Sequence, residues 1–90
     1  MSGMFSRDSV RHYLIEIFSR FSESDDHPVT EGSHITGDLG IDSINIMEII
    51  AELEDRFDLT IPDEALPAIQ TVGDAIRAVV DRLSAAGRLS

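Results

Sequence analysis

Residues 37–50 read Gly-Asp-Leu-Gly-Ile-Asp-Ser-Ile-Asn-Ile-Met-Glu-Ile-Ile, and they decide the fold because a glycine-containing loop leads here into the clearest helical pattern of the chain. Successive side chains of an α-helix lie about 100° apart, so residues three or four positions apart share a face. Five apolar residues form one such stripe: Ile46, Ile49, Ile50, Leu53 and Phe57. The pattern predicts a helix over residues 43–57 that packs against a core along this stripe.

The same helix also has an apolar patch on its opposite side, with acidic residues around it. The apolar residues are Ile44, Met47 and Ala51, and the acids are Glu48, Glu54 and Asp55. A helix that buries one face has no packing reason for a second one, and exposed apolar patches often contact other proteins. Scattered apolar residues on a surface are also common and often have no function. The second face is therefore either a docking face or ordinary surface.

Asp42 and Ser43 lie at the start of this helix, where a short side-chain oxygen can accept a hydrogen bond from a free backbone N–H group. Either residue is a suitable N-cap. The serine has two interpretations. It only caps the helix, or its hydroxyl is held at the junction of loop and helix so that another group can be attached, with the positive helix end available to a phosphate.

Residues 38–44, Asp-Leu-Gly-Ile-Asp-Ser-Ile, form a motif, and further residues that belong to the same pattern follow it. They are Glu48, Leu53-Glu54, Arg56-Phe57, Ile61-Pro62-Asp63-Glu64 and Thr71-Val72. Together they closely resemble the acyl carrier protein family, in register over about residues 35–83. In that family the serine of the Asp-Ser-[Leu/Ile] motif carries 4′-phosphopantetheine through a phosphodiester. The resemblance implies that Ser43 is the attachment residue and that Asp42 is the acid before it.

The chain departs from the family pattern near this motif and beyond it. The family often has Leu and Asp where this chain has Ile44 and Asn45, and it often has an acid where this chain has Arg56. Pro67 lies within the segment that usually forms a short third helix. The attachment serine is present, so the departures concern the subtype and the partner enzymes.

In addition to the helix over residues 43–57, the sequence predicts two long helices and one short irregular third helix. The expected helices cover about residues 6–21, 43–57, 63–67 and 71–86. The apolar stripes of the first and last are Val10, Leu14, Ile17, Phe18 and Phe21, and Val72, Ile76, Val79, Val80 and Leu83. Thr71 and Asp74 have capping-box spacing, with Asp replacing the usual Glu or Gln. Pro67 should restrict the third helix to an irregular or 3₁₀-like turn.

Residues 22–41 show no helical period and should form a long loop. Four apolar side chains are expected to attach it to the core: Val29, Ile35, Leu39 and Ile41. Residues 1–5 are expected to be frayed. Three main helices with one core face each predict an all-α fold, a small three- to four-helix bundle with a long first loop and a short irregular third helix. Residues 1–90 should form a single acyl-carrier-like domain.

Composition restricts the classes of function. The chain has 17 acidic and 7 basic residues, and its formal net charge is −10. Nine of the acids and one base, Arg56, lie between Asp38 and Glu64. Because binding to phosphates needs clustered cations, the charge argues against nucleic acid and anionic membranes and favours partners that present Lys and Arg. Considered without the motif, the charge has an alternative interpretation, an acidic face that only maintains solubility.

Two other chemistries are poorly supported by these residues. His12, His27 and His34 have neither i, i+4 pairing nor cysteine partners, so we expect no metal site. A serine hydrolase would need the G-x-S-x-G turn and a histidine at recognisable spacing after Ser43, and the chain has neither. The chain also lacks cysteine, a signal peptide and a membrane-spanning apolar run, which predicts a cytoplasmic protein without disulfides or membrane insertion.

The resemblance implies a monomeric carrier protein and no enzyme. It would hold acyl intermediates as thioesters on the phosphopantetheine arm at Ser43 and shuttle them between enzymes of fatty-acid, polyketide or related lipid biosynthesis. Its partners would be a phosphopantetheinyl transferase and acyl-transferring and chain-elongating enzymes with basic docking surfaces. These partners would contact Ile44, Met47, Glu48, Ala51, Glu54 and Asp55. The alternatives are an unmodified acidic helical protein-interaction module and a peptidyl or aminoacyl carrier.

Overall fold

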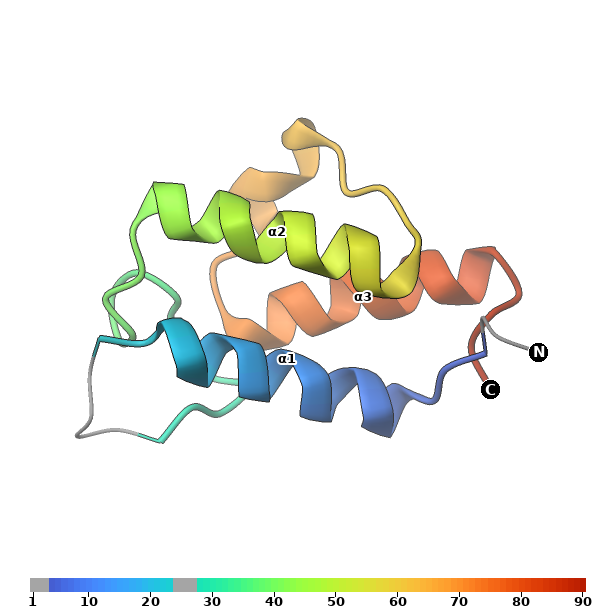
Figure 1. Ribbon diagram of the computed structural model, residues 1–90, viewed down its shortest axis with the longest axis horizontal. Coiled ribbons are helices and arrows are strands. Elements are labelled where there is room, and N and C mark those ends of the chain that lie inside the picture. The colour runs from blue at the N-terminus through green and yellow to red at the C-terminus, as the bar shows by residue number, and fades with distance from the viewer. Residues whose placement is uncertain (1–3, 24–27) are drawn as a thin grey trace.

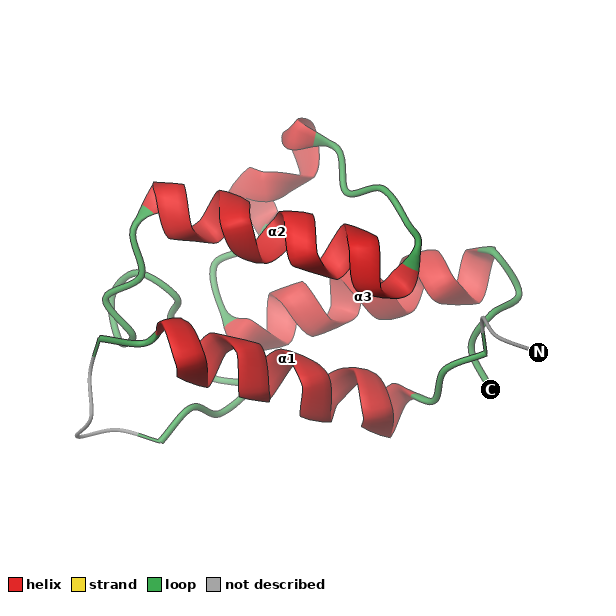
Figure 2. Cartoon of the chain, viewed as in Figure 1, coloured by secondary structure: helices red, strands yellow, loops and turns green. Residues whose placement is uncertain are grey.

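The computed structural model describes residues 4–23 and 28–90, which form helices connected by loops (Figure 1). The elements are α1 (Arg7–Phe21), α2 (Ser43–Phe57), the 3₁₀-helix η1 (Asp63–Ala68) and α3 (Val72–Ala85). Within the described residues β-pairing is limited to isolated bridges, and Figure 2 accordingly shows no strand. The predicted fold class, a small helical bundle with a long first loop and a short third helix, is confirmed.

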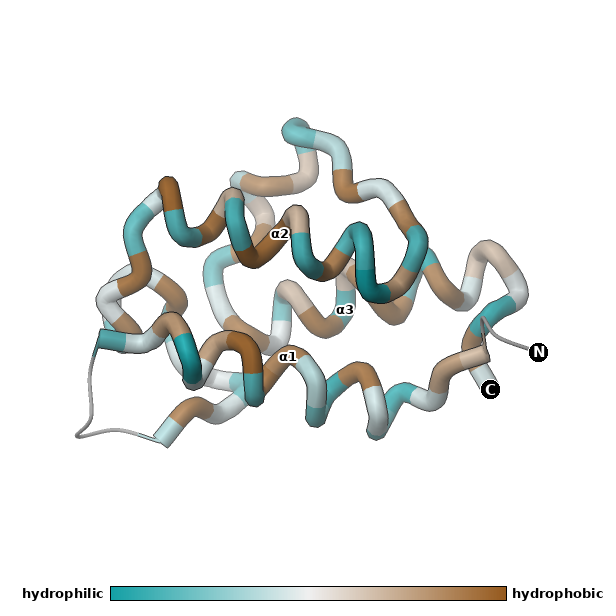
Figure 3. Tube along the Cα trace, in the orientation of Figure 1, coloured by the Kyte–Doolittle hydropathy of each residue, from teal (hydrophilic) through white to brown (hydrophobic). Residues whose placement is uncertain are grey.

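The core lies between α1, α2 and α3, and apolar and polar segments alternate along the helices (Figure 3). The helical residues buried in it are Val10, Leu14, Ile17, Phe18, Ile49, Ile50, Leu53, Phe57, Val72, Ala75, Ile76, Val79, Val80 and Leu83. Phe21 and Ile46, predicted to share these stripes, are only partly buried and pack against the edge of the core. The helical periods therefore predicted the core-facing stripes well.

Helix α1 begins with a capping box made by two serines. Ser6 Oγ accepts a hydrogen bond from Ser9 N at 3.1 Å, and Ser9 Oγ accepts one from Ser6 N at 3.2 Å. The second serine thus takes the place that Glu or Gln has in the usual box. This arrangement satisfies two of the free N–H groups at the helix start.

The prediction that residues 1–5 are frayed is wrong for Phe5. Its backbone forms a parallel bridge with Leu89, and its amide donates to the carbonyl oxygen of Arg88 at 2.8 Å. Its ring meets the ring of buried Phe57 edge-on, with 4.9 Å between the centroids. Residues 1–3 lie outside the described part of the chain. The two ends of the described chain therefore meet at one end of the bundle (Figure 1).

The long first loop is attached to the core and to the start of α3. Three of the predicted side chains, Ile35, Leu39 and Ile41, are buried, and Val29 is partly buried. Three backbone hydrogen bonds join the loop to the start of α3 and the residues before it. They run from Ile35 N to Gln70 O and from Val72 N to Ser33 O, each 3.0 Å long, and from Gly73 N to Glu31 O, 2.8 Å long. Residues 24–27 of the loop lie outside the described residues. These contacts fix the loop that leads into α2.

Helix α3 begins with a capping box formed by Thr71 and Asp74. Thr71 Oγ1 accepts from Asp74 N, and Asp74 Oδ2 accepts from Thr71 N and Gln70 N, all at 3.1 Å. The backbone donors of Gln70 and Thr71 hold the pKa of Asp74 below its ordinary value of 3.8, because they stabilise the carboxylate. Side-chain hydrogen bonds from Thr71 and Arg77 act in the same direction, while burial opposes them.

The segment between α2 and η1 is held by charged side chains of two helices. Asp58, the C-cap of α2, has a left-handed backbone with φ of 52°. Glu54 Oε2 accepts a hydrogen bond from Ile61 N at 2.8 Å, and Arg82 Nε donates to Thr60 O at 3.0 Å. None of the residues of η1 is fully buried, and its interior proline agrees with the irregular turn predicted here.

Candidate functional site

Ser43 is the first residue of α2, and its side chain is exposed. The residue before it caps the helix, because Asp42 Oδ1 accepts a hydrogen bond from Asn45 N at 2.8 Å. The Ser43 hydroxyl has no hydrogen-bond partner among the described residues. Capping therefore does not use the serine, and its hydroxyl is available for a covalent bond.

Two backbone amides next to this hydroxyl also lack an acceptor within the described part of the chain. They belong to Ser43 and Ile44, whereas the amides of Asn45 and Ile46 are satisfied by the side chain and the carbonyl group of Asp42. Free N–H groups and the positive end of the helix dipole favour an anion at this place. A phosphodiester on Ser43 Oγ would carry its negative charge beside them, so the residues fit the group that the resemblance implies.

The loop before Asp42 is anchored, which fixes the place of the serine. Gly40 has a φ of 68°, a left-handed conformation that glycine adopts without steric cost. Ile41 is buried, and its amide donates to Ile35 O at 3.1 Å. Since Asp42 and Ser43 follow directly, the junction of loop and helix is tied to the core on the side of the loop as well as on the side of α2.

The second apolar face of α2 is exposed. Ile44 and Met47 are 71% and 50% exposed, and Ala51 is exposed beside them. Met4 is the one other large apolar residue of the described chain that is exposed to this degree. The structure thus brings the three predicted apolar residues together on the surface of α2, near the end that bears Ser43.

The three acids predicted around this patch have different surroundings. The carboxylates of Glu48 and Asp55 are exposed and contact no cation or hydrogen-bond donor among the described residues. Glu54 is partly buried, and one of its oxygens is engaged by Ile61 N. The sequence did not predict this second role of Glu54, because a hydrogen bond to a residue beyond the helix end leaves no periodic signal. Glu48 and Asp55 remain the acids fully available to a partner.

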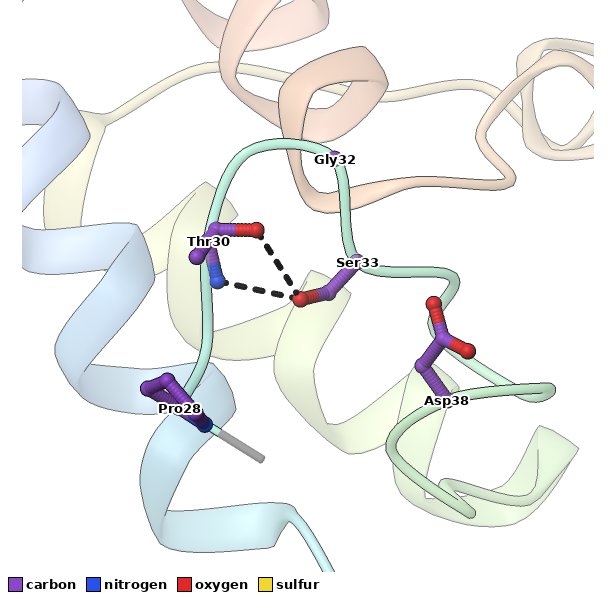
Figure 4. Close-up of a pocket in the computed structure, with 5 residues that line it drawn as sticks. All are labelled: Pro28, Thr30, Gly32, Ser33 and Asp38. Atoms are coloured by element: carbon purple, nitrogen blue, oxygen red, sulfur yellow. Dashed lines mark hydrogen bonds between the residues drawn. The ribbon is translucent and has the colours of Figure 1, made fainter. Parts of the chain in front are cut away.

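Two surface hollows of the molecule have linings that do not include Ser43. One of about 400 Å³ lies in the first loop and is lined by Pro28, Thr30, Gly32, Ser33 and Asp38 (Figure 4). In it, Thr30 N donates to Ser33 Oγ at 3.0 Å, and Asp38 accepts a hydrogen bond from the amide of His34 at 2.8 Å. The other, of about 210 Å³, lies between η1 and α3. Ser43 lines neither hollow, so attachment to it would occur on the open surface.

The described residues contain no group of three His, Asp or Glu side chains arranged to hold a metal ion. His27 lies outside them. None of the helices in the described ranges combines the length and the apolar character needed to cross a membrane.

Comparison with known proteins agrees with the sequence and the geometry. Residues 12–79 match the family model described as phosphopantetheine attachment site. An acyl carrier protein of Phenylobacterium zucineum is 43% identical over 85 residues, which cover 94% of this chain and 100% of the relative. An acyl carrier protein of Caulobacter vibrioides is 40% identical over 82 residues, covering 91% and 97%.

Solved structures show the same similarity. The acyl carrier protein of Enterococcus faecalis superposes with a TM-score of 0.74 at 36% identity, covering 87% of this chain and 99% of that one. The acetyl actinorhodin acyl carrier protein of Streptomyces coelicolor superposes with a TM-score of 0.64 at 26% identity, covering 96% and 99%. Both are small proteins matched over nearly their whole length.

These matches define the class of protein as a domain for the attachment of phosphopantetheine. Within that class, the chain belongs to the acyl carrier protein family, as the identity and coverage of its relatives show. It is a carrier, and its prosthetic group is 4′-phosphopantetheine. The family resemblance and the carrier function predicted from the sequence are confirmed.

Proposed function

We propose that Ser43 Oγ is the attachment atom for 4′-phosphopantetheine. The observation that carries this assignment is the exposed hydroxyl beside the free amides of Ser43 and Ile44, with Asp42 performing the capping. When bound, the prosthetic group supplies a terminal thiol that holds an acyl group as a thioester, a chemistry for which the chain has no cysteine of its own.

The contribution of the chain to attachment is to position the hydroxyl. A phosphopantetheinyl transferase would use coenzyme A as the donor and Ser43 as the acceptor. Asp42 stabilises the start of α2 by accepting a hydrogen bond from Asn45 N, and the amides of Ser43 and Ile44, which have no acceptor among the described residues, would donate to the phosphodiester. This arrangement favours the charged product at the helix end.

Partner enzymes would dock on the outer face of α2. Ile44, Met47 and Ala51 provide the apolar contact, and Glu48 and Asp55 attract cationic side chains of the partner. Glu54 contributes less than these two acids, through the carboxylate oxygen that Ile61 N does not engage. Such charges mainly raise the encounter rate and orient the partner, which suits a carrier that must leave each enzyme after transfer.

The pathway we propose is fatty-acid, polyketide or related lipid biosynthesis, served by acyl-transferring and chain-elongating enzymes. The acidic α2 and the Asp-Ser-Ile motif favour this class over a peptidyl or aminoacyl carrier. A single carrier domain over residues 1–90, a monomeric state and a cytoplasmic location stay predictions from the sequence.

The assignment of Ser43 is tested by labelling with a fluorescent coenzyme A analogue and a broad-specificity phosphopantetheinyl transferase. The wild-type protein should be labelled and Ser43→Ala should not, although its circular dichroism spectrum is unchanged. Ser84→Ala is the matched control, because Ser84 is an exposed serine of α3. Labelling of Ser43→Ala at the wild-type level would overturn the assignment. Failure of several active transferases on the wild type would instead favour the unmodified interaction module.

A further inference from the structure

One side of α2 carries a row of charged residues. Glu48, Glu52 and Arg56 are spaced by four positions and therefore lie along one side of the helix. Arg56 is the only base between Asp38 and Glu64. The row thus begins with an acid of the docking face, Glu48, and ends in a positive charge at the C-terminal end of α2.

The guanidinium of Arg56 is held in place by aromatic rings. It lies over the ring of Tyr13 on α1, with 5.2 Å between Cζ and the centroid. The Tyr13 ring meets Phe57 edge-on at 5.4 Å, and Phe57 is buried in the core. The cation is therefore anchored to the bundle although Arg56 is itself exposed. A guanidinium over the face of a ring can still donate hydrogen bonds from its N–H groups.

Arg56 forms no ion pair or hydrogen bond through its side chain with another described residue. Its natural intramolecular partner is Glu52, four positions earlier, because such pairs stabilise helices. Glu52 instead lies 3.8 Å from the guanidinium of Arg20 on α1. The helix dipole favours a cation in the last turn of α2, but it explains neither the aromatic anchor nor the unused donors.

We propose that Arg56 pairs with a carboxylate of the enzyme that docks on α2. The partner would present cations to Glu48 and Asp55 and one acidic side chain to Arg56, so that it can bind in only one direction along the helix. A planar guanidinium with free donors matches a carboxylate in a bidentate geometry. This inference rests on the proposed carrier function and names a residue that orients the partner.

The distance from Ser43 determines which kinetic parameter Arg56 controls. Arg56 lies thirteen positions after Ser43 in the same helix, which corresponds to about 20 Å along the axis at the usual rise per residue. Arg56 therefore does not touch the reacting hydroxyl. Its effect should fall on KM for the protein substrate, while kcat for attachment stays unchanged.

The test uses the phosphopantetheinyl transferase that, in a panel, loads the wild-type protein with the highest kcat/KM. Arg56→Glu should raise KM about fivefold or more at unchanged kcat, because attraction becomes like-charge repulsion. Arg56→Gln and Arg56→Lys should both give KM values between those of the wild type and Arg56→Glu, with Arg56→Lys nearer the wild type, because lysine keeps the charge but not the bidentate geometry. The effect of Arg56→Glu should shrink in about 1 M salt, where the Debye length is about 3 Å. A loss of packing would not depend on salt in this way.

The control variant is Arg77→Glu, which makes the same change of charge at an exposed arginine of α3. The KM of this variant should stay within about twofold of the wild type if the position of the charge on α2 determines the effect. A larger increase would mean that the total charge of the protein determines it. An unchanged or lower KM for Arg56→Glu would overturn the proposal. A partner surface that responds only to negative charge would bind this variant at least as tightly as the wild type, because α2 has one more acid. Loading of the wild type at Ser43 is measured in the same assay, so failure of the carrier function is seen separately.

Discussion

At the scale of single residues, Asp42 and Ser43 have different roles at the site: Asp42 caps α2, and Ser43 keeps its hydroxyl free. Both are good capping residues, so the sequence alone left open which of them caps α2. In the structure the aspartate accepts the hydrogen bond from Asn45 N, and the serine hydroxyl stays exposed without a partner among the described residues. A neighbour that caps the helix is what makes a serine at a helix start available for modification.

The capping role of Asp42 predicts a loss of stability on its removal. Asp42→Ala should lower the free energy of unfolding by about 1 kcal/mol, as is typical for a lost N-cap. Asp42→Asn keeps a side-chain oxygen and should cost only a few tenths of a kcal/mol. Urea denaturation of both variants measures the difference. Equal losses for Asn and Ala would show that the hydrogen bond to Asn45 N is not the cause.

Asp74 predicts a pH dependence of stability. Its pKa is lowered in the folded protein, so its stabilising contribution is present above the unfolded pKa and is lost as the pH falls through the folded one. The difference in unfolding free energy between the wild type and Asp74→Asn should therefore be larger at about pH 7 than at about pH 2.5. Urea denaturation at both pH values measures it. A difference that does not change with pH would contradict the charged capping interaction.

At the scale of elements, α2 combines three functions on three sides. One side packs in the core, and a second presents Ile44 and Met47 on the surface. On the third side, Glu52 and Arg56 contact Arg20 and Tyr13 of α1. The first two sides could be predicted from the sequence, because the helical period sorts side chains by direction. The third could not, because the partners of Glu52 and Arg56 lie on another helix and depend on how the two helices cross.

The different surroundings of Glu48 and Glu54 predict that removal of Glu48 changes mainly KM and removal of Glu54 changes mainly stability. Glu48→Ala should leave stability within about 0.5 kcal/mol of the wild type, as for other exposed positions, and should raise KM for the transferase. Glu54→Ala should lower stability by about 1 kcal/mol, because the amide of Ile61 loses its acceptor. Urea denaturation and loading kinetics of the same preparations test this pair. Equal stability of the two variants would show that the hydrogen bond from Ile61 N to Glu54 does not stabilise the fold.

At the scale of the whole molecule, the ends of the described chain close the bundle opposite Ser43. Arg88 donates from its guanidinium to the carbonyl oxygens of Phe57, the last residue of α2, and of its C-cap Asp58, and it lies over the ring of Phe5. No local pattern in the sequence predicts this closure, since Phe5 and Arg88 stand near opposite ends of the chain. This is why the segment around Phe5 was wrongly expected to be frayed.

Arg88→Ala should therefore destabilise the fold and not the site. Two carbonyl oxygens at the end of α2 lose a charged donor, which should cost about 2 kcal/mol. Thermal and urea unfolding measure the loss, and loading of Ser43 at a temperature where the variant is folded should keep the wild-type kcat. Wild-type stability of Arg88→Ala would show that the closure contributes nothing to the fold.

The central claim is that Ser43 bears the prosthetic group, and the most direct measurement is the intact mass of the protein after incubation with coenzyme A, Mg²⁺ and an active phosphopantetheinyl transferase, followed by peptide mapping. The account predicts a single phosphopantetheine on the peptide that contains Ser43. Addition at another residue, or no addition with transferases that modify a control carrier, would contradict it.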